Sequence, residues 1–390
     1  MMLSERLPAT GMLRDHREGH PLRKERQTSG LDGVCLLLRW LAIVVIPTLP
    51  ACSPWPASTS GASGEALYIF RVQPPALIEL AADNRTLKEL PITVPGGCEV
   101  DNLFAPPRGA TLAIELACSF GQAVVWLNTQ SGELKQPVTD SDSHFMAWTP
   151  DGAAAYLKVD SLNRPHIIRA PISGRSENVP ITELSYDLSP RPASNTDFLF
   201  SFSRGMGLGS EMWLARFDGR LVQHVIADPH HYLSFARWSP DGTKVAFIKI
   251  PDSATPFTVG ELWVMHADGS NAHKLADADA GHGFAEAWSP DGSHVAFVVR
   301  ENPNDVQADQ RADALRSNIS LVKANDGTVS ALTSIQSARV EAPTWSPDGN
   351  TLAFTVVLND KMNVYIADVA SGTTQQVLPV SVCCPVWVRK

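Results

Sequence analysis

The sequence predicts an all-β protein: a seven-bladed β-propeller of four-stranded blades, closed by pairing the C-terminal strand with the N-terminal strands. The first observation behind this prediction is a repeated motif. Trp-Ser-Pro-Asp-Gly occupies 238–242, 288–292 and 345–349, and a copy with Thr in place of Ser occupies 148–152. The second observation is the short alternating apolar run after each copy, such as Val-Ala-Phe at 245–247. A repeat that cannot bury its own faces must stack on its neighbours.

Each copy of the motif predicts a strand, a tight turn and a second strand. Proline presets the backbone at the first turn corner, aspartate accepts a hydrogen bond from the chain just ahead, and glycine takes the positive φ that a side chain resists. The second half of each repeat is a hairpin with a two-residue turn, and such dipeptides between alternating runs are strong hairpin signals. Seven of these turns occur: Asp83-Asn84, Ser131-Gly132, Ser173-Gly174, Asp218-Gly219, Asp268-Gly269, Asp326-Gly327 and Ser371-Gly372.

The two ends of the chain each supply part of one further blade. Six complete repeats open at Phe104, Trp148, Leu188, Trp238, Trp288 and Trp345. A seventh opener, 385–388, ends the chain with no second strand after it, whereas 66–72, 76–80 and 85–90 read as a second, third and fourth strand without a first. We therefore expect the two ends to complete a seventh blade, which leaves only short sheet edges exposed.

Composition predicts one large domain over 65–390. The chain has 390 residues, of which 44 % are hydrophobic, enough for a large core. The formal net charge is -9; residues 1–51 hold seven Lys and Arg against five Asp and Glu, so the remainder holds 25 against 36. This acidic surface argues against nucleic acid or an anionic membrane surface as a partner.

Residues 1–51 have the features of an export signal that is removed from the mature protein. A basic segment precedes an apolar run whose uncharged part, 40–51, is too short to span a bilayer. Leu49-Pro50-Ala51-Cys52 resembles the bacterial lipobox, although Pro50 departs from the small residue usual there. The resemblance implies cleavage before Cys52 and a lipid anchor on that residue, in the outer membrane if the cell is Gram-negative. An ordinary secretory signal with a nearby cysteine is the alternative.

The segments on either side of the signal give two further expectations. Residues 1–30 are long for the basic part of a signal, so we expect translation to start downstream of Met1. Residues 52–64 are rich in Ser, Pro and Gly, a composition typical of a flexible tether between an anchor and a folded domain.

The Trp-Ser-Pro-Asp-Gly turn followed by a Leu/Val-Ala-Phe strand resembles the WD-repeat-like propeller repeat of TolB and of the N-terminal domains of prolyl-oligopeptidase-type enzymes. The resemblance covers about residues 65–388, with close copies at four openers and degenerate ones at Phe104, Leu188 and Trp387. It implies a propeller fold and specifies function weakly. TolB has six blades and a separate N-terminal domain, whereas we expect seven blades and see neither that domain nor a hydrolase domain.

The long connections are all expected on one face of the propeller. Strands alternate in direction, so the first-to-second and third-to-fourth turns share one face, and the other connections share the opposite face. Only the second set varies in length, with its longest members at 300–317, 249–260 and 203–210. Variable loops on a rigid scaffold are the usual place for binding. The candidate binding residues on this face are His144, His230, His231, His282, Arg300, Asp305 and Arg311.

The histidines of this face, together with Asp142, Asp228 and Asp279, are residue types that could bind calcium or zinc. No His pair has a recognised ligand spacing, so we predict exposed loop histidines and no metal or other cofactor. Residues just before each Trp position lie on innermost strands, which makes Asp101, Glu286 and Glu341 candidates for an acidic channel. The alternative is that these carboxylates bond the neighbouring backbone.

Four cysteines remain if Cys52 is lipidated and Cys35 leaves with the signal. Cys98 and Cys118 are equidistant from the turn at position 108, so the hairpin should place them opposite each other, and we favour a disulfide between them. A bridge between Cys383 and Cys384, or from Cys98 to one of these two, remains open.

No catalytic signature stands out. The chain lacks Gly-x-Ser-x-Gly, a phosphate loop, His-Glu-x-x-His and Cys-x-x-Cys. We therefore expect a non-catalytic, lipid-anchored, monomeric scaffold of the bacterial envelope that binds a protein, a peptide or another ligand on its long-loop face. The alternative is a propeller hydrolase, a lactonase or glycan-cleaving enzyme, acting at the channel mouth with its carboxylates.

Overall fold

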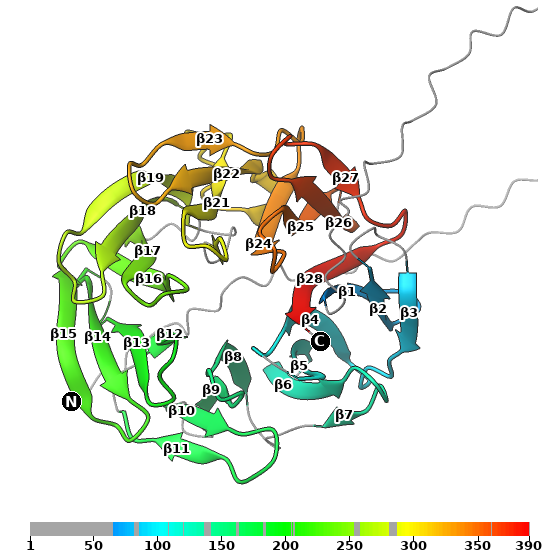
Figure 1. Ribbon diagram of the computed structural model, residues 1–390, viewed down its shortest axis with the longest axis horizontal. Helices are drawn as coiled ribbons and strands as arrows, with labels where there is room; N and C mark the ends of the chain where they lie inside the picture. Colours follow the sequence, from blue (N-terminus) through cyan, green and yellow to red (C-terminus); the bar gives the residue numbers. More distant parts are fainter. Residues whose placement is uncertain are drawn as a thin grey trace, which may run out of the picture. The chain divides into compact units, whose positions relative to one another are not determined.

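The computed structural model describes residues 65–81, 86–107, 109–119, 121–135, 142–160, 164–181, 185–203, 205, 207–252, 258–280, 287–359 and 361–389. These residues form seven four-stranded antiparallel sheets arranged in a ring, as the sequence predicts (Figure 1). The signal region and tether, together with Cys52 and the turn at Asp83-Asn84, lie outside the described residues. No helix within the described ranges is long and apolar enough to cross a membrane.

The blades follow one another along the chain, apart from the closing strand. Blade 1 contains β28 (Val382–Arg389), β1 (Glu65–Arg71), β2 (Ala76–Leu80) and β3 (Thr86–Pro91). Blade 2 contains β4 (Cys98–Phe104), β5 (Thr111–Cys118), β6 (Gly121–Asn128) and β7 (Leu134–Lys135). Blade 3 contains β8 (Ser143–Trp148), β9 (Ala154–Val159), β10 (Pro165–Ala170) and β11 (Glu177–Val179). Blade 4 contains β12 (Ser185–Pro190), β13 (Asp197–Phe202), β14 (Ser210–Arg216) and β15 (Leu221–Asp228).

The last three blades carry the most regular repeats. Blade 5 contains β16 (His231–Trp238), β17 (Lys244–Pro251), β18 (Val259–His266) and β19 (His273–Asp279). Blade 6 contains β20 (Ala287–Trp288), β21 (His294–Arg300), the 3-10 turn η1 (Ala312–Ala314), β22 (Ser317–Lys323) and β23 (Val329–Ala331). Blade 7 contains β24 (Arg339–Trp345), β25 (Thr351–Leu358), β26 (Lys361–Asp368) and β27 (Thr374–Gln376).

The expected closure of the ring by the two ends of the chain is confirmed. Strand β28 pairs with β1, with Leu67 opposite Trp387 and Tyr68 opposite Val386. In Figure 1 the red C-terminal strand lies beside the blue N-terminal one. Because the first strand of blade 1 comes from the far end of the chain, the ring closes through backbone hydrogen bonds within a sheet.

The repeated motif forms its turn through its own side chains. The Ser239 hydroxyl donates to Asp241 Oδ1 at 2.6 Å and accepts the Lys244 N–H at 2.9 Å. Gly242 has φ of 67°, a conformation that disfavours side chains. Blades 6 and 7 repeat the two bonds at the same distances. Serine, aspartate and glycine are therefore needed by the turn itself.

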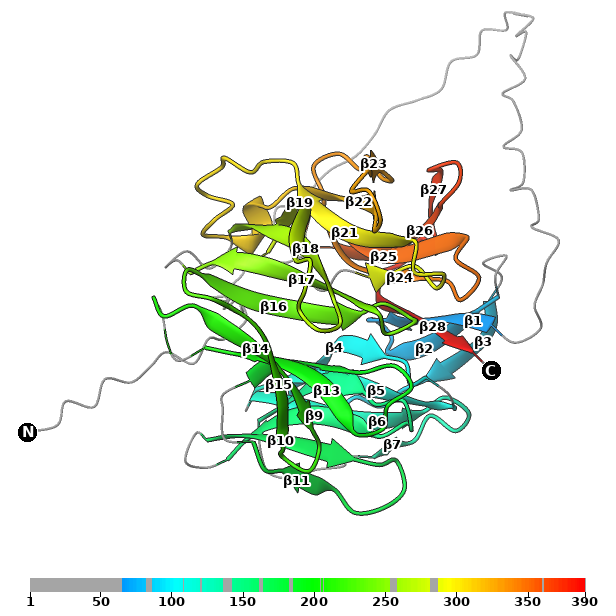
Figure 2. The same ribbon diagram turned by 60° about the vertical axis from the view of Figure 1, so that its left-hand side comes forward.

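Side chains of the second strands fill the space between blades. Phe247, Phe297 and Phe354 occupy the same position in blades 5, 6 and 7 and are at most 2 % exposed. Each blade is covered on both sides, so these strands are apolar on both faces. In Figure 2 the sheet of β16 and β17 lies against that of β13 and β14, and the apolar side chains of both form one cluster.

Candidate functional site

The two faces of the ring differ in the length of their connections. The first-to-second and third-to-fourth turns, on what we call the turn face, are short in the described residues. The opposite loop face carries the connections 203–209, 252–258 and 301–316, parts of the first two lying outside the described residues. This division agrees with the sequence-based assignment and leaves the loop face as the candidate binding surface.

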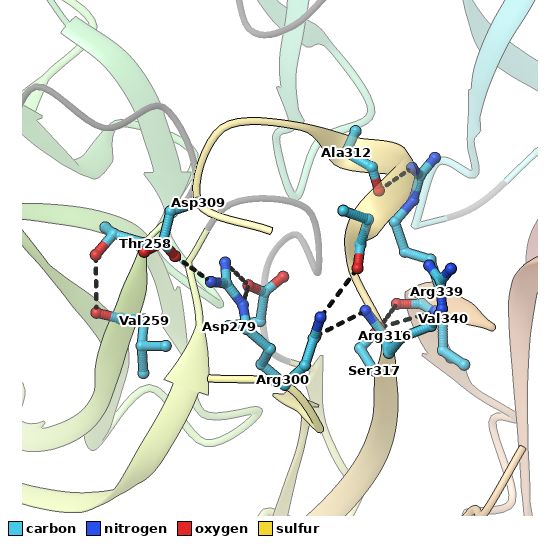
Figure 3. A network of polar contacts seen from close by, with 12 residues as sticks. Thr258, Val259, Asp279, Arg300, Asp309, Ala312, Arg316, Ser317, Arg339 and Val340 are labelled. Atoms are coloured by element: carbon cyan, nitrogen blue, oxygen red, sulfur yellow. Dashed lines mark hydrogen bonds and ion pairs between the residues drawn. The ribbon is translucent and has the colours of Figure 1, made fainter. Parts of the chain in front are cut away.

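The longest of these loops, 301–316, is anchored at its base by a buried arginine (Figure 3). Arg300 ends β21, and its side chain is 1 % exposed. Its Nη2 donates to Asp279 Oδ1 at 2.9 Å, and its Nη1 donates to Asp309 Oδ1 at 2.6 Å. Breaking a buried pair leaves an uncompensated charge, so this contact fixes the loop to blade 5. Sequence analysis places Arg300 on the binding face; its burial instead gives it a supporting role.

A second set of polar contacts fixes the same loop to blade 7. Arg339, at the start of β24, donates from Nη1 to the Ala312 carbonyl at 2.9 Å (Figure 3). Its Nε donates to Glu341. At the end of the loop, the Val340 N–H donates to Ser317 Oγ at 2.9 Å. The loop thus bridges from blade 5 to blade 7 across its own blade.

The loop also has a small core and a regular interior. Ala308 and Leu315 are at most 1 % exposed. Asp305 accepts the Gln307 N–H at 2.9 Å and a bond from Asn302 Nδ2 at 3.0 Å, so its carboxylate stabilises a turn of the loop. These contacts hold the loop in one conformation, so little conformational entropy of the loop would be lost when a partner binds.

Apolar side chains project from the tips of two loops on this face. Val306 is 72 % exposed and Leu208 is 63 % exposed, the two highest values among the large apolar residues described. Leu208 lies in the Gly-rich loop, where the backbone N–H groups of Gly207 and Gly209 donate to Asp252 Oδ2 at 2.6 and 3.2 Å. A protein carboxylate therefore occupies the donors of this loop. Arg311, in the same loop as Val306, is also exposed and pairs with Asp313.

Asp101 on β4 of blade 2 interacts with two other acidic residues, Glu115 on β5 of the same blade and Glu341 on β24 of blade 7. Burial raises the pKa of both Glu115 and Glu341, and the Asp101 carboxylate raises each of them further. Asp101 lies at a β-bulge of β4, where its side chain is exposed. Asp101 thus interacts with both glutamates, and we call these three residues the acidic edge.

Histidine and arginine partly neutralise the acidic edge. His144 Nδ1 lies 3.3 Å from Glu115 Oε1, and this contact raises the pKa of His144. The Nε2 of the same ring is 3.8 Å from Asp142. Glu341 is bonded by Arg339, which lowers its pKa in opposition to burial. The His144 ring therefore lies between the carboxyl groups of Glu115 and Asp142. Burial disfavours the charged form of the third group, Glu341.

Of the other predicted site residues, His230 and His231 lie beside Asp228 of blade 4. His231 Nδ1 lies 2.9 Å from Asp228 Oδ1, while His230 is exposed beside it and its N–H donates to the same oxygen at 2.9 Å. His282 and Glu286 lie outside the described residues. Across the part of the chain that is described, no three His, Cys, Asp or Glu side chains are grouped closely enough to hold a metal ion.

Both disulfides lie at the junction of blades 1 and 2. Cys98 and Cys118 face each other across β4 and β5 and form a bridge, the pairing that the sequence favours. Cys383 and Cys384 form a vicinal bridge at the start of β28, one of the arrangements that the sequence leaves open. The Cys384 Sγ lies 3.4 Å from the Asp101 carbonyl, so the closing strand contacts the inner strand of blade 2.

Sequence reasoning missed Glu115, Arg339 and Asp252. Glu115 does carry a signal, because it is the only charged residue in the apolar strand Thr111–Cys118. Arg339 and Asp252 have no comparable signal, since their partners come from loops whose conformation is unknown from sequence alone.

Comparison with known proteins finds a match to a protein with similar repeats. No protein-family profile matches the chain. The Tol-Pal system protein TolB of Anaeromyxobacter dehalogenans (strain 2CP-1 / ATCC BAA-258) is 29 % identical over 116 residues, which is 29 % of this chain and 24 % of the relative. Together with the seven blades and their repeated turn, this match decides the type of repeat. The chain is a β-propeller built from TolB-type repeats.

The TolB-type propeller shares its fold with enzymes as well. It superposes on a puromycin-hydrolyzing peptidase of Mycobacterium tuberculosis with a TM-score of 0.56 and 13 % identity, covering 81 % of this chain and 52 % of that one. An oligogalacturonate lyase of Vibrio parahaemolyticus gives a TM-score of 0.52 and 13 % identity, with 80 % and 84 % covered. At such identity these likenesses establish the fold alone. The curated TolB match spans about a quarter of that relative's length.

Proposed function

We propose that this TolB-type propeller is an exported, lipid-anchored envelope protein that binds another envelope protein on its loop face. The observation that carries the proposal is the pair of apolar tips, Val306 and Leu208, which project from loops held in place by polar contacts within the protein. Exposed apolar side chains on a preorganised surface are typical of protein-binding sites, because little conformational entropy is lost when a partner docks.

The chemistry of the surface limits the kind of partner. Val306 and Leu208 offer apolar anchors, while the exposed carboxylate of Asp101 adds negative potential on the inner strand of blade 2. A partner with apolar residues and a basic segment would complement both. The curated relatives are named for the Tol-Pal system, which supports an envelope protein as the partner. We propose that the chain itself is monomeric.

Site-specific crosslinking tests the face. A photoreactive amino acid at Val306 or Leu208 should capture one discrete partner in intact cells, and the same group at Ile172 should not. Ile172 is the matched control because it is an apolar residue, 44 % exposed, in a turn of the opposite face. The substitution Val306→Asp should weaken the capture from Leu208 about tenfold without changing thermal stability. Equal capture from Ile172, or none from either loop tip, would refute the assignment of the loop face.

The membrane anchor has its own test. We propose that Cys52 carries the lipid, because it follows a lipobox-like sequence and precedes a flexible tether. The Cys52→Ser protein should move from the membrane pellet to the soluble envelope fraction, while Cys98→Ala should not be released. Cys52→Ser protein that still sediments with membranes would count against lipidation and leave the binding proposal intact.

A second candidate function is hydrolysis at the acidic edge. The observation in its favour is that Glu115 and Glu341 both have raised pKa values, as a general acid requires. Lactones and acidic oligosaccharides are the substrates to assay, with Glu341→Gln and Glu115→Gln as the variants. Turnover that both substitutions abolish in folded protein would replace the scaffold proposal with this one.

A further inference from the structure

In two neighbouring blades, the first residue of the second strand and its partner on the third strand are both Lys or His, which is not so in blades 2, 3, 4 and 7. In blade 5, Lys244 pairs across the sheet with His266, and in blade 6, His294 pairs with Lys323. The corresponding pairs in blades 2, 3, 4 and 7 are Thr with Asn, Ala with Ala, Asp with Arg, and Thr with Asp. Like charges directly opposite each other destabilise a sheet. Because Lys and His face each other in two adjacent blades, we look for a function of this position.

These four side chains surround a hollow on the turn face. One part of the hollow is lined by Lys244, His266 and His273, and an adjoining part by Lys244, His294 and Lys323. The Lys244 Nζ donates to the Ala324 carbonyl at 3.4 Å, which places its ammonium group between blades 5 and 6. The hollow is thus built by both blades and lies on the face opposite the proposed protein-binding loops.

The three imidazoles direct one nitrogen each toward their own turns. His273 Nδ1 lies 2.8 Å from the Asn271 carbonyl, and His294 Nδ1 lies 2.7 Å from Ser293 Oγ. His266 Nδ1 is 3.1 Å from Ser270 Oγ. The Nε2 atom of each ring has no hydrogen-bond partner among the described residues, which leaves it available to a ligand.

The nearby carboxylates are occupied by their own turns. Asp268 accepts bonds from Ser270, and Asp326 accepts the Thr328 N–H. Asp291 accepts the hydroxyl groups of Ser289 and Ser293, and the first of these bonds is the largest cause that lowers its pKa to about 2. These three acids reduce the positive potential of the hollow but offer little competition for its free N–H groups.

We propose that this hollow binds a phosphate group, carried either by a soluble molecule or by a lipid headgroup. Two ammonium groups act as compact point charges, and imidazole rings from two separate blades present an Nε2–H donor when both of their ring nitrogens are protonated. A tetrahedral dianion can accept from several directions at once, which suits this arrangement better than a planar carboxylate does. The site stands out because the chain as a whole is acidic, with a formal net charge of -9.

Titration of the intact protein with inorganic phosphate at constant ionic strength tests the proposal. The ring proton signals of His266, His273 and His294 should shift along one saturable curve, while those of His166 and His224, which lie in blades 3 and 4, should remain in place. Lys244→Met and Lys323→Met should each weaken binding about tenfold. Lys135→Met is the matched control, because Lys135 is 68 % exposed on blade 2 and should leave the affinity unchanged.

A second arm distinguishes the two sources of phosphate. Cys52→Ser protein is sedimented with vesicles that contain phosphatidic acid or only phosphatidylcholine. Binding to the first vesicles that Lys244→Met abolishes assigns a lipid headgroup, whereas phosphate binding without vesicle binding assigns a soluble ligand. Equal shifts with sodium chloride, or unaltered phosphate affinity in Lys244→Met, would overturn the site.

Discussion

The Trp238 indole N–H donates to the Ser189 carbonyl at 3.1 Å, from the inner strand of blade 5 to that of blade 4. The same bond joins blade 3 to blade 2, blade 6 to blade 5 and blade 7 to blade 6, at 2.9 to 3.1 Å. The tryptophan of the repeated motif therefore connects successive blades as well as filling space. Trp387, at the equivalent position of the closing strand, is the exception, because its N–H meets no acceptor among the described residues.

This difference predicts unequal effects for two chemically identical substitutions. Trp238→Phe removes apolar area and leaves the Ser189 carbonyl without its donor, whereas Trp387→Phe removes area together with a buried N–H that has no acceptor in the described part of the chain. We expect the free energy of unfolding to fall by about 1 kcal/mol more for Trp238→Phe than for Trp387→Phe. Urea denaturation of the two variants measures the difference. Equal destabilisation would mean that the interblade bond adds nothing beyond packing.

The number of blades could be predicted because the turns of each repeat are formed by residues close together in the sequence. The serine, aspartate and glycine of the motif satisfy their own turn, as Ser239 and Asp241 show, so the motif marks four blades without knowledge of the fold. The seven two-residue turns between the third and fourth strands complete the count. The same logic applies to Cys98 and Cys118, since a hairpin fixes which residues lie opposite. Closure by Trp387 and Leu67 followed from counting strands at both ends.

The site could be predicted only in outline, because its contacts join segments far apart in the sequence. The sequence shows that 300–317 is a long charged loop, but the burial of Arg300 depends on Asp279 from the preceding blade. Likewise, the pairing of Glu115 with His144 crosses from blade 2 to blade 3. Side chains assigned to one face by topology can therefore point into the protein instead of toward a partner.

Arg300→Met should be among the most destabilising substitutions in the loop region. It removes one charge and leaves Asp279, whose side chain is 2 % exposed, without its principal cation. Breaking a buried pair from one side typically lowers the free energy of unfolding by about 3 to 5 kcal/mol.

Arg311→Met is the control for this substitution. Its side chain is 64 % exposed and pairs with the exposed Asp313, so we expect a change within about 0.5 kcal/mol. Limited proteolysis should also cut 301–316 faster in Arg300→Met than in Arg311→Met. Similar stability and cleavage in both variants would contradict the anchoring role of Arg300.

Tyr68 should make the closing blade sensitive to alkali. Burial, reinforced by the carboxylate of Glu79, raises the pKa of Tyr68 to about 12, above its ordinary value of 10.0. The folded protein therefore retains this proton where the unfolded chain releases it. The resulting stability is fully present below about pH 10 and declines as pH rises from about 10 to 12. Tyr68→Phe should flatten this part of the stability curve; an unchanged alkaline decline would assign it to other groups.

The Cys98–Cys118 bridge should stabilise the protein mainly by restricting the unfolded chain. It spans 20 residues, and a loop of that size corresponds to about 3 kcal/mol in the chain-entropy account. The vicinal Cys383–Cys384 bridge, with a separation of one residue, restricts the unfolded chain far less. Reduction should thus lower the unfolding free energy of the wild type by about 3 kcal/mol, and that of Cys98→Ala/Cys118→Ala by much less. If reduction destabilises both proteins equally, the stabilising bridge is the vicinal one at the start of the closing strand.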